Sequence, residues 1–297
     1  MHKIIECIPN FSEGCDLEII ERIVNVFRAK EHVKLLDYSN DKDHNRMVVT
    51  VIGEPEAIKN RIIEAVGVAI DLIDITKHKG IHPRIGAADV IPFVPIKGMT
   101  MDETDVLAKE CGYLLAEKYQ LPVYFYEKSA SAAYRQNLAA IRKGEFEGLV
   151  EKMKLLEWKP DAGPAERHPT AGASVVGARA PLIAFNVNLQ TADLGIADKI
   201  AKKVRYIGGG LRYCKALGMD LKEQGLVQVS MNLTDYTKTT IYQAVEMIRF
   251  EAKRYGVSVA GCELVGLVPL QAVTDTVSYY LGLEDFSINQ ILETQIE

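Results

Sequence analysis

Apolar side chains recur at two spacings along the chain, and the alternation between them predicts the order of its elements. Continuous runs of β-branched and other apolar residues predict strands, whereas apolar residues three or four positions apart predict helices. The first half is predicted to contain a strand at Lys3–Pro9, a helix from about Asp16, strands at Val33–Ser39 and Arg46–Gly53, a helix from Pro55 and a strand at Asp89–Ile96. This β-α-β-β-α-β order is that of a ferredoxin-like domain. A helix near Asp102–Tyr119 and a short strand at Pro122–Glu127 extend it.

The same order of elements returns in the second half, without a repeat at the level of residues. The pattern predicts a strand at Leu182–Leu189, a helix at Leu194–Lys203, strands at Gly210–Gly218 and Gly225–Leu233, a helix at Ile241–Tyr255, a strand at Ser258–Val268 and a last helix from about Pro269. Thr240 and Gln243 have the spacing of a capping box. We therefore expect an α/β (α+β) protein of two ferredoxin-like β-α-β-β-α-β subdomains, residues 1–180 and 181–297.

The segment between the two halves, Lys159–Pro181, is rich in Gly, Pro and Ala and poor in large apolar side chains. This composition predicts a loop. A loop of this length in a compact chain is more often functional than idle, and the alternative is a linker between domains. Arg167, His168 and Arg179 lie in this segment and favour a functional role.

Composition and charge narrow the class of protein. The chain has 297 residues, 48% of them apolar and 25% charged, which is typical of a globular protein of about two domains. No apolar stretch approaches the roughly 18–20 residues of a membrane span, and Met1–Gly14 lacks the features of a signal peptide. A net charge of −5 argues against a general nucleic-acid binder. The five cysteines are scattered and form no CxxC pair, so we expect reduced thiols and a cytoplasmic protein.

Candidate chemistry concentrates in the segment Thr76–Val90, TKHKGIHPRIGAADV, between a predicted helix and a predicted strand. His82 precedes a proline, which favours an extended backbone and an imidazole that projects from the loop. Such a histidine can take up and return a proton near neutral pH. The alternative is a loop histidine without a function, and the flanking Gly80 and Gly86 favour catalysis.

Other catalytic and cofactor motifs are weak or missing in the sequence. His78 and His82 have a spacing that suits a metal only on a helix, which Gly80 and Pro83 oppose, so we expect no metal site. In the glycine-rich run from Gly208, Tyr213 stands where GxGxxG requires its third glycine. There is no P-loop motif, no GxSxG elbow and no cysteine with a neighbouring histidine.

Several polar side chains lie where a loop meets a predicted strand. Arg46, Arg84 and Arg179 are such residues, and a planar guanidinium binds both oxygens of a carboxylate. They can therefore hold an anionic substrate, and the alternative for each is a surface ion pair. Asn10, in PNFSEG, either binds a ligand or belongs to a simple turn.

Motifs along the whole chain together resemble one enzyme family. They are IPNFSEG at the start, HKGIHPRIGAADVIPFVPI in the middle, and GARAPLIAFNVNL, LVQVSMNLTDY and ELVGLVP later on. In this order they resemble glutamate formimidoyltransferase (formiminotransferase), a folate enzyme of histidine breakdown. In animals this domain is the front half of a bifunctional protein with a cyclodeaminase behind it. We expect the stand-alone form here.

The resemblance also implies partners and site residues. It implies a homodimer formed through the first subdomain, a substrate cleft between the subdomains, His82 as the catalytic histidine, and tetrahydrofolate as co-substrate without a metal. The implied folate-binding loop consists of Gly163, Pro164, Ala165, Glu166, Arg167, His168, Pro169, Thr170, Ala171 and Gly172. We expect Arg84, two residues from His82, to hold a carboxylate of the amino-acid substrate, and Arg179 to help fix folate or the joint between subdomains.

The implied reaction moves the formimino group between N-formimino-L-glutamate and N5 of tetrahydrofolate. One nitrogen adds to the amidine carbon and the other leaves, which requires a proton shuttle such as His82. Two alternatives remain open: a 5-formyltetrahydrofolate:glutamate formyltransferase, whose donor differs by O for NH, and a non-catalytic module that binds folate or an amino acid. A metallohydrolase that uses His78 and His82 is a more distant alternative.

Overall fold

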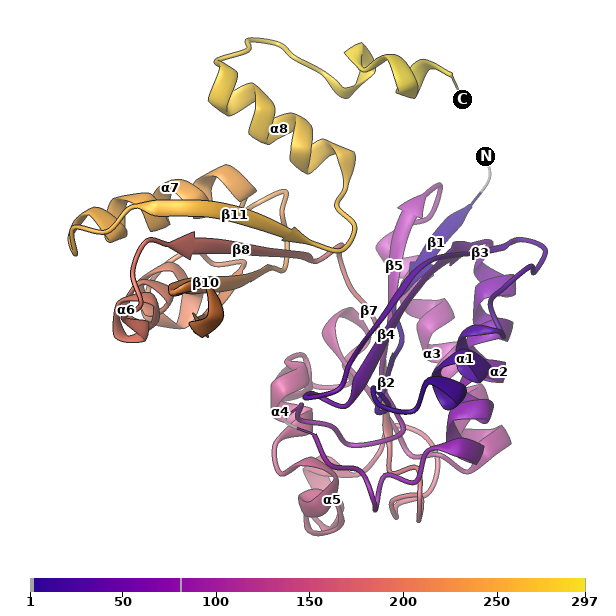
Figure 1. The fold of residues 1–297 in the computed structure, drawn as a ribbon. Coiled ribbons are helices and arrows are strands. Elements are labelled where there is room, and N and C mark those ends of the chain that lie inside the picture. Colours follow the sequence, from indigo (N-terminus) through magenta and orange to yellow (C-terminus); the bar gives the residue numbers. More distant parts are fainter. Residues whose placement is uncertain (1–2, 81, 297) are drawn as a thin grey trace. The chain divides into compact units, whose positions relative to one another are not determined.

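Two separate β-sheets form the framework of the protein in the computed structural model, which describes residues 3–80 and 82–296 (Figure 1). Ile81, in the predicted catalytic segment, lies outside the described residues. The chain divides into two units, Met1–Arg179 and Ala180–Glu297. None of the described helices is long and apolar enough to cross a membrane.

The first unit contains a seven-stranded sheet with a ferredoxin-like centre. Its strands are β1 (Ile4–Cys7), β2 (Asn10–Phe11), β3 (Val33–Asp41), β4 (Arg46–Gly53), β5 (Ala88–Lys97), β6 (Val123–Phe125) and β7 (Ser174–Ala178). β5 pairs with β1, β1 with β4 and β4 with β3, all antiparallel, so the first and last strands of the β-α-β-β-α-β unit lie side by side. β7 and β6 then extend the sheet in parallel from β5.

Helices cover both faces of this sheet (Figure 1). On one face lie α1 (Leu17–Val24), α2 (Pro55–Leu72) and α3 (Met101–Tyr119), whose apolar side chains form the main core of the unit with those of the strands. The side chain of Asp16 caps α1, and a capping box of Thr100 and Glu103 starts α3. On the other face, α4 (Leu138–Arg142) and α5 (Glu145–Lys154) cover only β5, β6 and β7, through Ile141, Leu149 and Met153.

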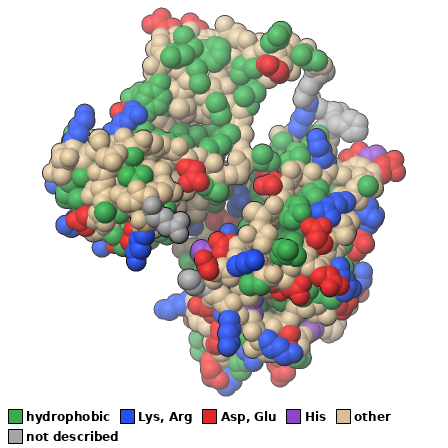
Figure 2. Space-filling view, in the orientation of Figure 1, with side chains coloured by type: hydrophobic (Ala, Val, Ile, Leu, Met, Phe, Trp, Pro, Cys, Tyr) green, Lys and Arg blue, Asp and Glu red, His purple; other side chains and the backbone are tan. Residues whose placement is uncertain are grey.

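The second unit is a four-stranded sheet in the order β11-β8-β10-β9. The strands are β8 (Ile183–Leu189), β9 (Cys214–Leu221), β10 (Leu226–Leu233) and β11 (Val259–Val265), and α6 (Leu194–Val204) and α7 (Ile241–Lys253) share one core with them. α8 (Leu270–Leu281) packs on α7, where the rings of Tyr242 and Tyr279 stack at 4.3 Å. Figure 2 shows apolar side chains gathered over α8, among them the exposed Val273, Val277 and Leu281.

The predicted fold class and the order of its elements are confirmed, but one loop prediction and two strand predictions need correction. Lys159–Pro181 is not one loop, because β7 lies within it. All five residues of β7 are buried, and they lack the large side chains by which a strand is recognised in a sequence. No prediction was made for the segment that contains α4 and α5.

The other two corrections concern strand ends. The strand predicted at Lys3–Pro9 is β1, which ends at Cys7, and Pro9 separates it from β2 because proline has no N–H to donate to a ladder. The strand predicted at Gly210–Gly218 begins at Cys214 and continues to Leu221. Gly210 instead packs against the end of α6, where a Cβ would lie 2.2 Å from the carbonyl oxygen of Lys203.

Candidate active site

The histidine-bearing segment and the predicted folate loop lie side by side in the first unit. The amide of Ile75 donates to the carbonyl oxygen of Thr170 at 2.8 Å, and the amide of Ala87 donates to that of Ala171 at 3.0 Å. These bonds lie on either side of His82 in the sequence. The loop that carries the histidine is therefore held against residues 170–171 at both of its ends.

Two glycines permit this close contact. A Cβ on Gly86 would lie 2.1 Å from the carbonyl oxygen of Ala173, and a Cβ on Gly172 would lie 2.1 Å from that of Ile85. Gly172 also has φ +71°, in the left-handed region that side chains other than glycine rarely adopt. No other residue fits either position without moving the backbone.

His82 is half-buried beside a guanidinium. Its Nε2 lies 3.3 Å from Nη1 of Arg46. Because a guanidinium can only donate, Nε2 is the acceptor and the ring proton is assigned to Nδ1. Burial, and then the charges of Arg46 and Arg142, lower the pKa of His82 to about 3. The imidazole is therefore neutral at pH 7 and offers a free electron pair, as a general base requires.

Arg46 is the first residue of β4 and the cation of this site that is left without a carboxylate. Among residues 3–80 and 82–296, no Asp or Glu oxygen lies within 4.0 Å of it, and His82 is its hydrogen-bond partner. Burial, followed by the charge of Arg142, lowers the pKa of its guanidinium. A half-buried guanidinium without a carboxylate partner has N–H groups available to bind an anion.

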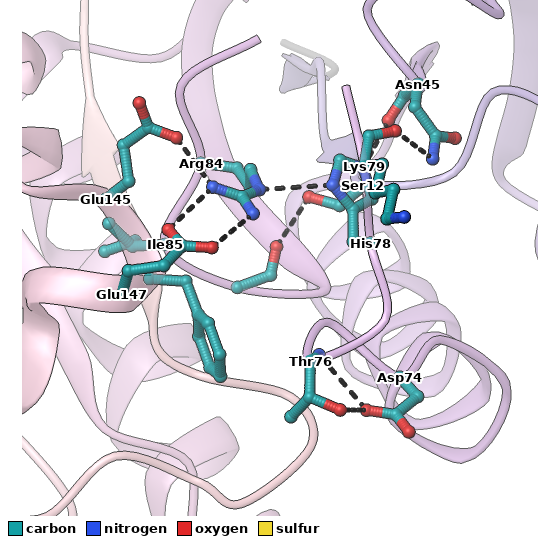
Figure 3. A network of polar contacts seen from close by, with 12 residues as sticks. Ser12, Asn45, Asp74, Thr76, His78, Lys79, Arg84, Ile85, Glu145 and Glu147 are labelled. Carbon is teal, nitrogen blue, oxygen red and sulfur yellow. Dashed lines mark hydrogen bonds and ion pairs between the residues drawn. The ribbon is translucent and has the colours of Figure 1, made fainter. Parts of the chain in front are cut away.

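Arg84 is buried and its guanidinium is already occupied (Figure 3). Nη1 donates to Oε2 of Glu145 at 2.6 Å. Nη1 and Nη2 also donate to the two carboxylate oxygens of Glu147, at 3.0 and 2.7 Å. Nε donates to Nδ1 of His78 at 3.1 Å. The expected contact between Arg84 and a substrate carboxylate stays a prediction, and this geometry favours a role in bracing the loop.

His78 and Asn45 connect Arg84 to the start of β4 (Figure 3). Nε2 of His78 lies 2.7 Å from the carbonyl oxygen of Asn45, so both ring nitrogens are engaged. Asn45, at φ +46°, also accepts from the amide of Gly14 at 2.8 Å and donates to the carbonyl oxygen of Lys79 at 2.9 Å. Because Asn45 immediately precedes Arg46, this network determines where the arginine lies.

One buried ion pair near the site was not foreseen from the sequence. Asp89, which is 1% exposed, pairs with Arg142 at the end of α4 and accepts from the amide of Ile85 at 2.8 Å. Arg142 is one of the charges that lower the pKa of His82. No sequence pattern marked it, since its partner lies in a distant segment.

Asn10 lies near Arg46, and Arg179 follows β7 beside β5. Asn10 stands opposite Val48, two residues along β4 from Arg46 and therefore on the same face of the sheet. The amide of Arg179 donates to the carbonyl oxygen of Phe93 at 3.0 Å. The structure therefore brings His82 to Arg46 and places Asn10 on the same face of the sheet as Arg46.

The predicted folate loop has an exposed opening and an anchored end. Gly163, Ala165 and Glu166 are exposed, whereas Ala171 and Gly172 are buried. Arg167 lies 4.0 Å above the ring of Phe146 and donates to its carbonyl oxygen at 2.9 Å. Nδ1 of His168 accepts from the amide of Ala171 at 3.0 Å. Pro164, Pro169 and Thr170 complete the loop.

The chain matches one protein family over both units. Residues 4–179 match the formiminotransferase domain, N-terminal subdomain, and residues 184–296 match the formiminotransferase domain. The chain belongs to the formiminotransferase family. This confirms the family that the sequence motifs indicated.

Formiminotransferase relatives from distant organisms align with this chain. A glutamate formimidoyltransferase of Streptococcus pyogenes serotype M1 is 48% identical over 100% of this chain and 99% of its own length. A second, of Thermoplasma acidophilum, is 45% identical over 99% of this chain and 98% of its own length. A formimidoyltransferase-cyclodeaminase of Dictyostelium discoideum is 44% identical, and there the match covers 100% of this chain but 56% of the relative.

Proposed function

We propose that the protein is a glutamate formimidoyltransferase, which moves the formimino group between N-formimino-L-glutamate and N5 of tetrahydrofolate. The observation that carries the chemistry is the neutral His82 within 3.3 Å of the unpaired Arg46. A base and an anion-binding cation are what an amino-acid donor with carboxylates requires. The names of the relatives aligned over almost their full length support the choice of substrates.

His82 is proposed to move the proton. Arg46 binds a carboxylate of N-formimino-L-glutamate, and the negative charge raises the pKa of the neighbouring imidazole toward neutrality. N5 of tetrahydrofolate forms a bond to the amidine carbon, and its proton passes to Nε2 of His82. The bond from that carbon to the glutamate nitrogen then breaks, and His82 returns the proton to the leaving nitrogen. No proton is gained or lost overall.

The exposed opening of the loop Gly163–Gly172 is proposed to contact tetrahydrofolate, which serves as co-substrate. Support comes from the hydrogen bonds that hold the end of this loop against the segment of His82. Binding here would bring the folate to the base. Orientation of two bound substrates adds several kcal/mol of catalysis beyond proton transfer.

We further propose that the protein is cytoplasmic and forms a homodimer. All five cysteines are free thiols, which supports a reducing compartment, and we place the protein in the cytoplasm. We place a homodimer contact on the first unit, where Val106 and Tyr113 of α3 are 57% and 55% exposed. Light scattering coupled to gel filtration measures the molar mass of the protein in solution and so distinguishes a dimer from a monomer.

The activity is tested by incubating the purified protein with tetrahydrofolate and N-formimino-L-glutamate and following the folate absorbance. The matched assay supplies 5-formyltetrahydrofolate and glutamate. Turnover in the first assay supports the proposal, and turnover confined to the second supports the formyltransferase. Folate binding without turnover in either assay would identify a binding module and sink the proposed activity.

A further inference from the structure

The corner between α4 and α5, residues 142–146, carries an arginine that has no role in the proposed reaction (Figure 1). Arg142 is the last residue of α4, and its side chain is 12% exposed. Its Nη2 donates to Oδ2 of the buried Asp89. A guanidinium this deeply placed, beside the segment that carries the base, is a candidate for contact with the substrate.

The corner is attached to the histidine-bearing loop at two points. At the first, the amide of Phe146 donates to the carbonyl oxygen of Arg84 at 2.9 Å. At the second, the carboxylate of Asp89 joins the arginine of α4 to the amide of Ile85, which donates to it at 2.8 Å. Arg84 and Ile85 closely follow the histidine in the sequence, so the corner and the loop are held together.

A lysine of α5 holds the end of α4. Nζ of Lys152 donates to the carbonyl oxygens of Ala140 and Ile141, both at 2.6 Å. It also donates to that of Lys143, at 3.2 Å. The last carbonyl groups of a helix have no partner within the helix, and a cation there is favourable. The backbone on both sides of Arg142 is therefore held in place, as the positioning of a ligand requires.

The guanidinium of Arg142 keeps donors that no described residue uses. Among residues 3–80 and 82–296, Asp89 is its hydrogen-bond partner, and neither Nη1 nor the buried Nε has an acceptor. A buried polar atom without a partner is rare in folded proteins. Arg84, in contrast, engages all three nitrogens of its guanidinium. Nη1 of Arg142 therefore has N–H groups available for an anion.

The pairing of the strands places this ion pair close to Arg46. β2 pairs with the start of β4 on one side and with the start of β5 on the other. The two starts are therefore two strand spacings apart, roughly 10 Å. Arg46 is the first residue of β4, and Asp89 is the second of β5. After burial, the charge of Arg142 is the next cause that lowers the pKa of Arg46, and after burial and Arg46 it also lowers that of His82. Two arginine cations thus act on one neutral imidazole.

We propose that Arg142 binds the side-chain carboxylate of the amino-acid substrate and so selects a dicarboxylate. The assignment rests on the proposed function, which supplies a donor with two carboxylates. The α-carboxylate is attached to the carbon that bears the reacting nitrogen, so it binds beside the base, at Arg46. The side-chain carboxylate lies further from that nitrogen and requires a second cation, which Arg142 provides. A dianion also offsets the repulsion between the two arginines.

The test is isothermal titration calorimetry with the whole chain, which compares N-formimino-L-glutamate with N-formimino-L-glutamine, whose side chain ends in a neutral amide. The variant Arg142→Lys keeps a cation beside Asp89 but loses the planar fork. We expect R142K to bind the glutamate derivative roughly tenfold or more weakly, because a charge-assisted hydrogen bond is lost, and the glutamine derivative within about twofold of the wild type.

The matched control is Arg135→Lys. Arg135 precedes α4 and also pairs with a buried carboxylate, that of Asp161, at 2.7 Å. Its other hydrogen bonds go to the carbonyl oxygens of Glu157 and Lys159, which belong to neither loop of the candidate active site. R135K removes the same fork from a buried ion pair, and it should bind both derivatives as the wild type does.

Every outcome decides the assignment. An equal loss for both derivatives in R142K would show that Arg142 acts through the fold, and unchanged binding of both would show that it does not contact the substrate; each result overturns the assignment. A loss that persists with the glutamine derivative but disappears with N-formimino-L-isoglutamine would place Arg142 at the α-carboxylate and overturn it too.

A second variant covers a failure to fold. If R142K does not fold, the double variant Asp89→Asn, Arg142→Gln removes both charges of the ion pair and is titrated in the same way. The titrations need no turnover, so a selective loss in a protein without transferase activity would sink the proposed function and leave this assignment intact. Transfer that persists, with an equal effect of R142K on both derivatives, would sink the assignment and leave the function.

Discussion

At the scale of single residues, the site combines a base with two kinds of arginine. Arg46 lacks a carboxylate and faces His82, while Arg84 is surrounded by Glu145 and Glu147. We therefore propose that Arg46 binds an anion and that Arg84 braces the loop. The neighbours of each arginine support this choice, which the separation from His82 in the sequence could not provide.

The first prediction concerns the titration of His82. In the free protein its imidazole should titrate near pH 3, and nuclear magnetic resonance of labelled histidine measures this. Because the fold lowers the pKa from its ordinary 6.5, the unfolded chain binds the proton more readily. The contribution of His82 to the free energy of unfolding is thus fully present above about pH 6.5 and is lost as the pH falls toward 3. Removing a charge with Arg46→Gln should raise the pKa, and a lower value in that variant would contradict the assignment.

The second prediction is that His82→Ala lowers kcat by about 10²- to 10⁴-fold because the proton shuttle is lost. Steady-state kinetics measures this, and calorimetry should show tetrahydrofolate binding within a few-fold of the wild type. His32→Asn is the control, since asparagine tolerates the left-handed backbone found there, at φ +61°. A loss of equal size in the control would point to a general effect on folding.

The third prediction separates the two arginines. Arg46→Lys keeps the charge but loses the planar fork, so KM for N-formimino-L-glutamate should rise roughly tenfold while KM for tetrahydrofolate changes little. Arg84→Lys should instead lower the free energy of unfolding by about 1–2 kcal/mol, through the lost contacts with Glu147 and His78. Kinetics and chemical denaturation measure the two effects. A selective rise of that KM in R84K alone would restore the sequence-based role of Arg84.

At the scale of elements, long periodic segments were predictable and short ones made of small residues were not. α2 and β4 follow from their apolar patterns. β7 was not predicted because its small side chains resemble those of a loop. Its position in the sheet follows from its pairing with β5 and β6. The candidate active site was likewise only partly predictable. A motif marks His82, but the pairing of Arg142 with Asp89 exists only once the chain has folded.

The fourth prediction tests how closely the two loops must approach. Gly172→Ala places a Cβ against the carbonyl oxygen of Ile85 in a backbone of φ +71° and should destabilise the protein by several kcal/mol. Gly209→Ala is the matched control, because φ there is +87° but no atom lies within 4 Å of the added Cβ. It should cost about 1–2 kcal/mol. Equal losses in chemical denaturation would show that the contact between the loops contributes nothing.

At the scale of the whole molecule, the chain consists of two units, each with its own sheet and its own core. The fifth prediction is that Ala180–Glu297 folds alone, because the core of its sheet, α6 and α7 is complete within that segment. Circular dichroism should show a cooperative thermal transition. A gradual change without a midpoint would show that the unit depends on the rest of the chain.

The position of β7 has a consequence for how the protein is made. β7 lies between β5 and β6 in the sheet, yet it is the last strand of the first unit to be synthesised. While the ribosome translates α4 and α5, the nascent chain already contains β5 and β6 but not the strand that joins them. The edge of β5 is unpaired during this time, and an open strand edge invites pairing with other chains. The first unit can close its sheet only after Ser174–Ala178 leave the exit tunnel, so slow translation of the segment before β7 would prolong the exposure of that edge.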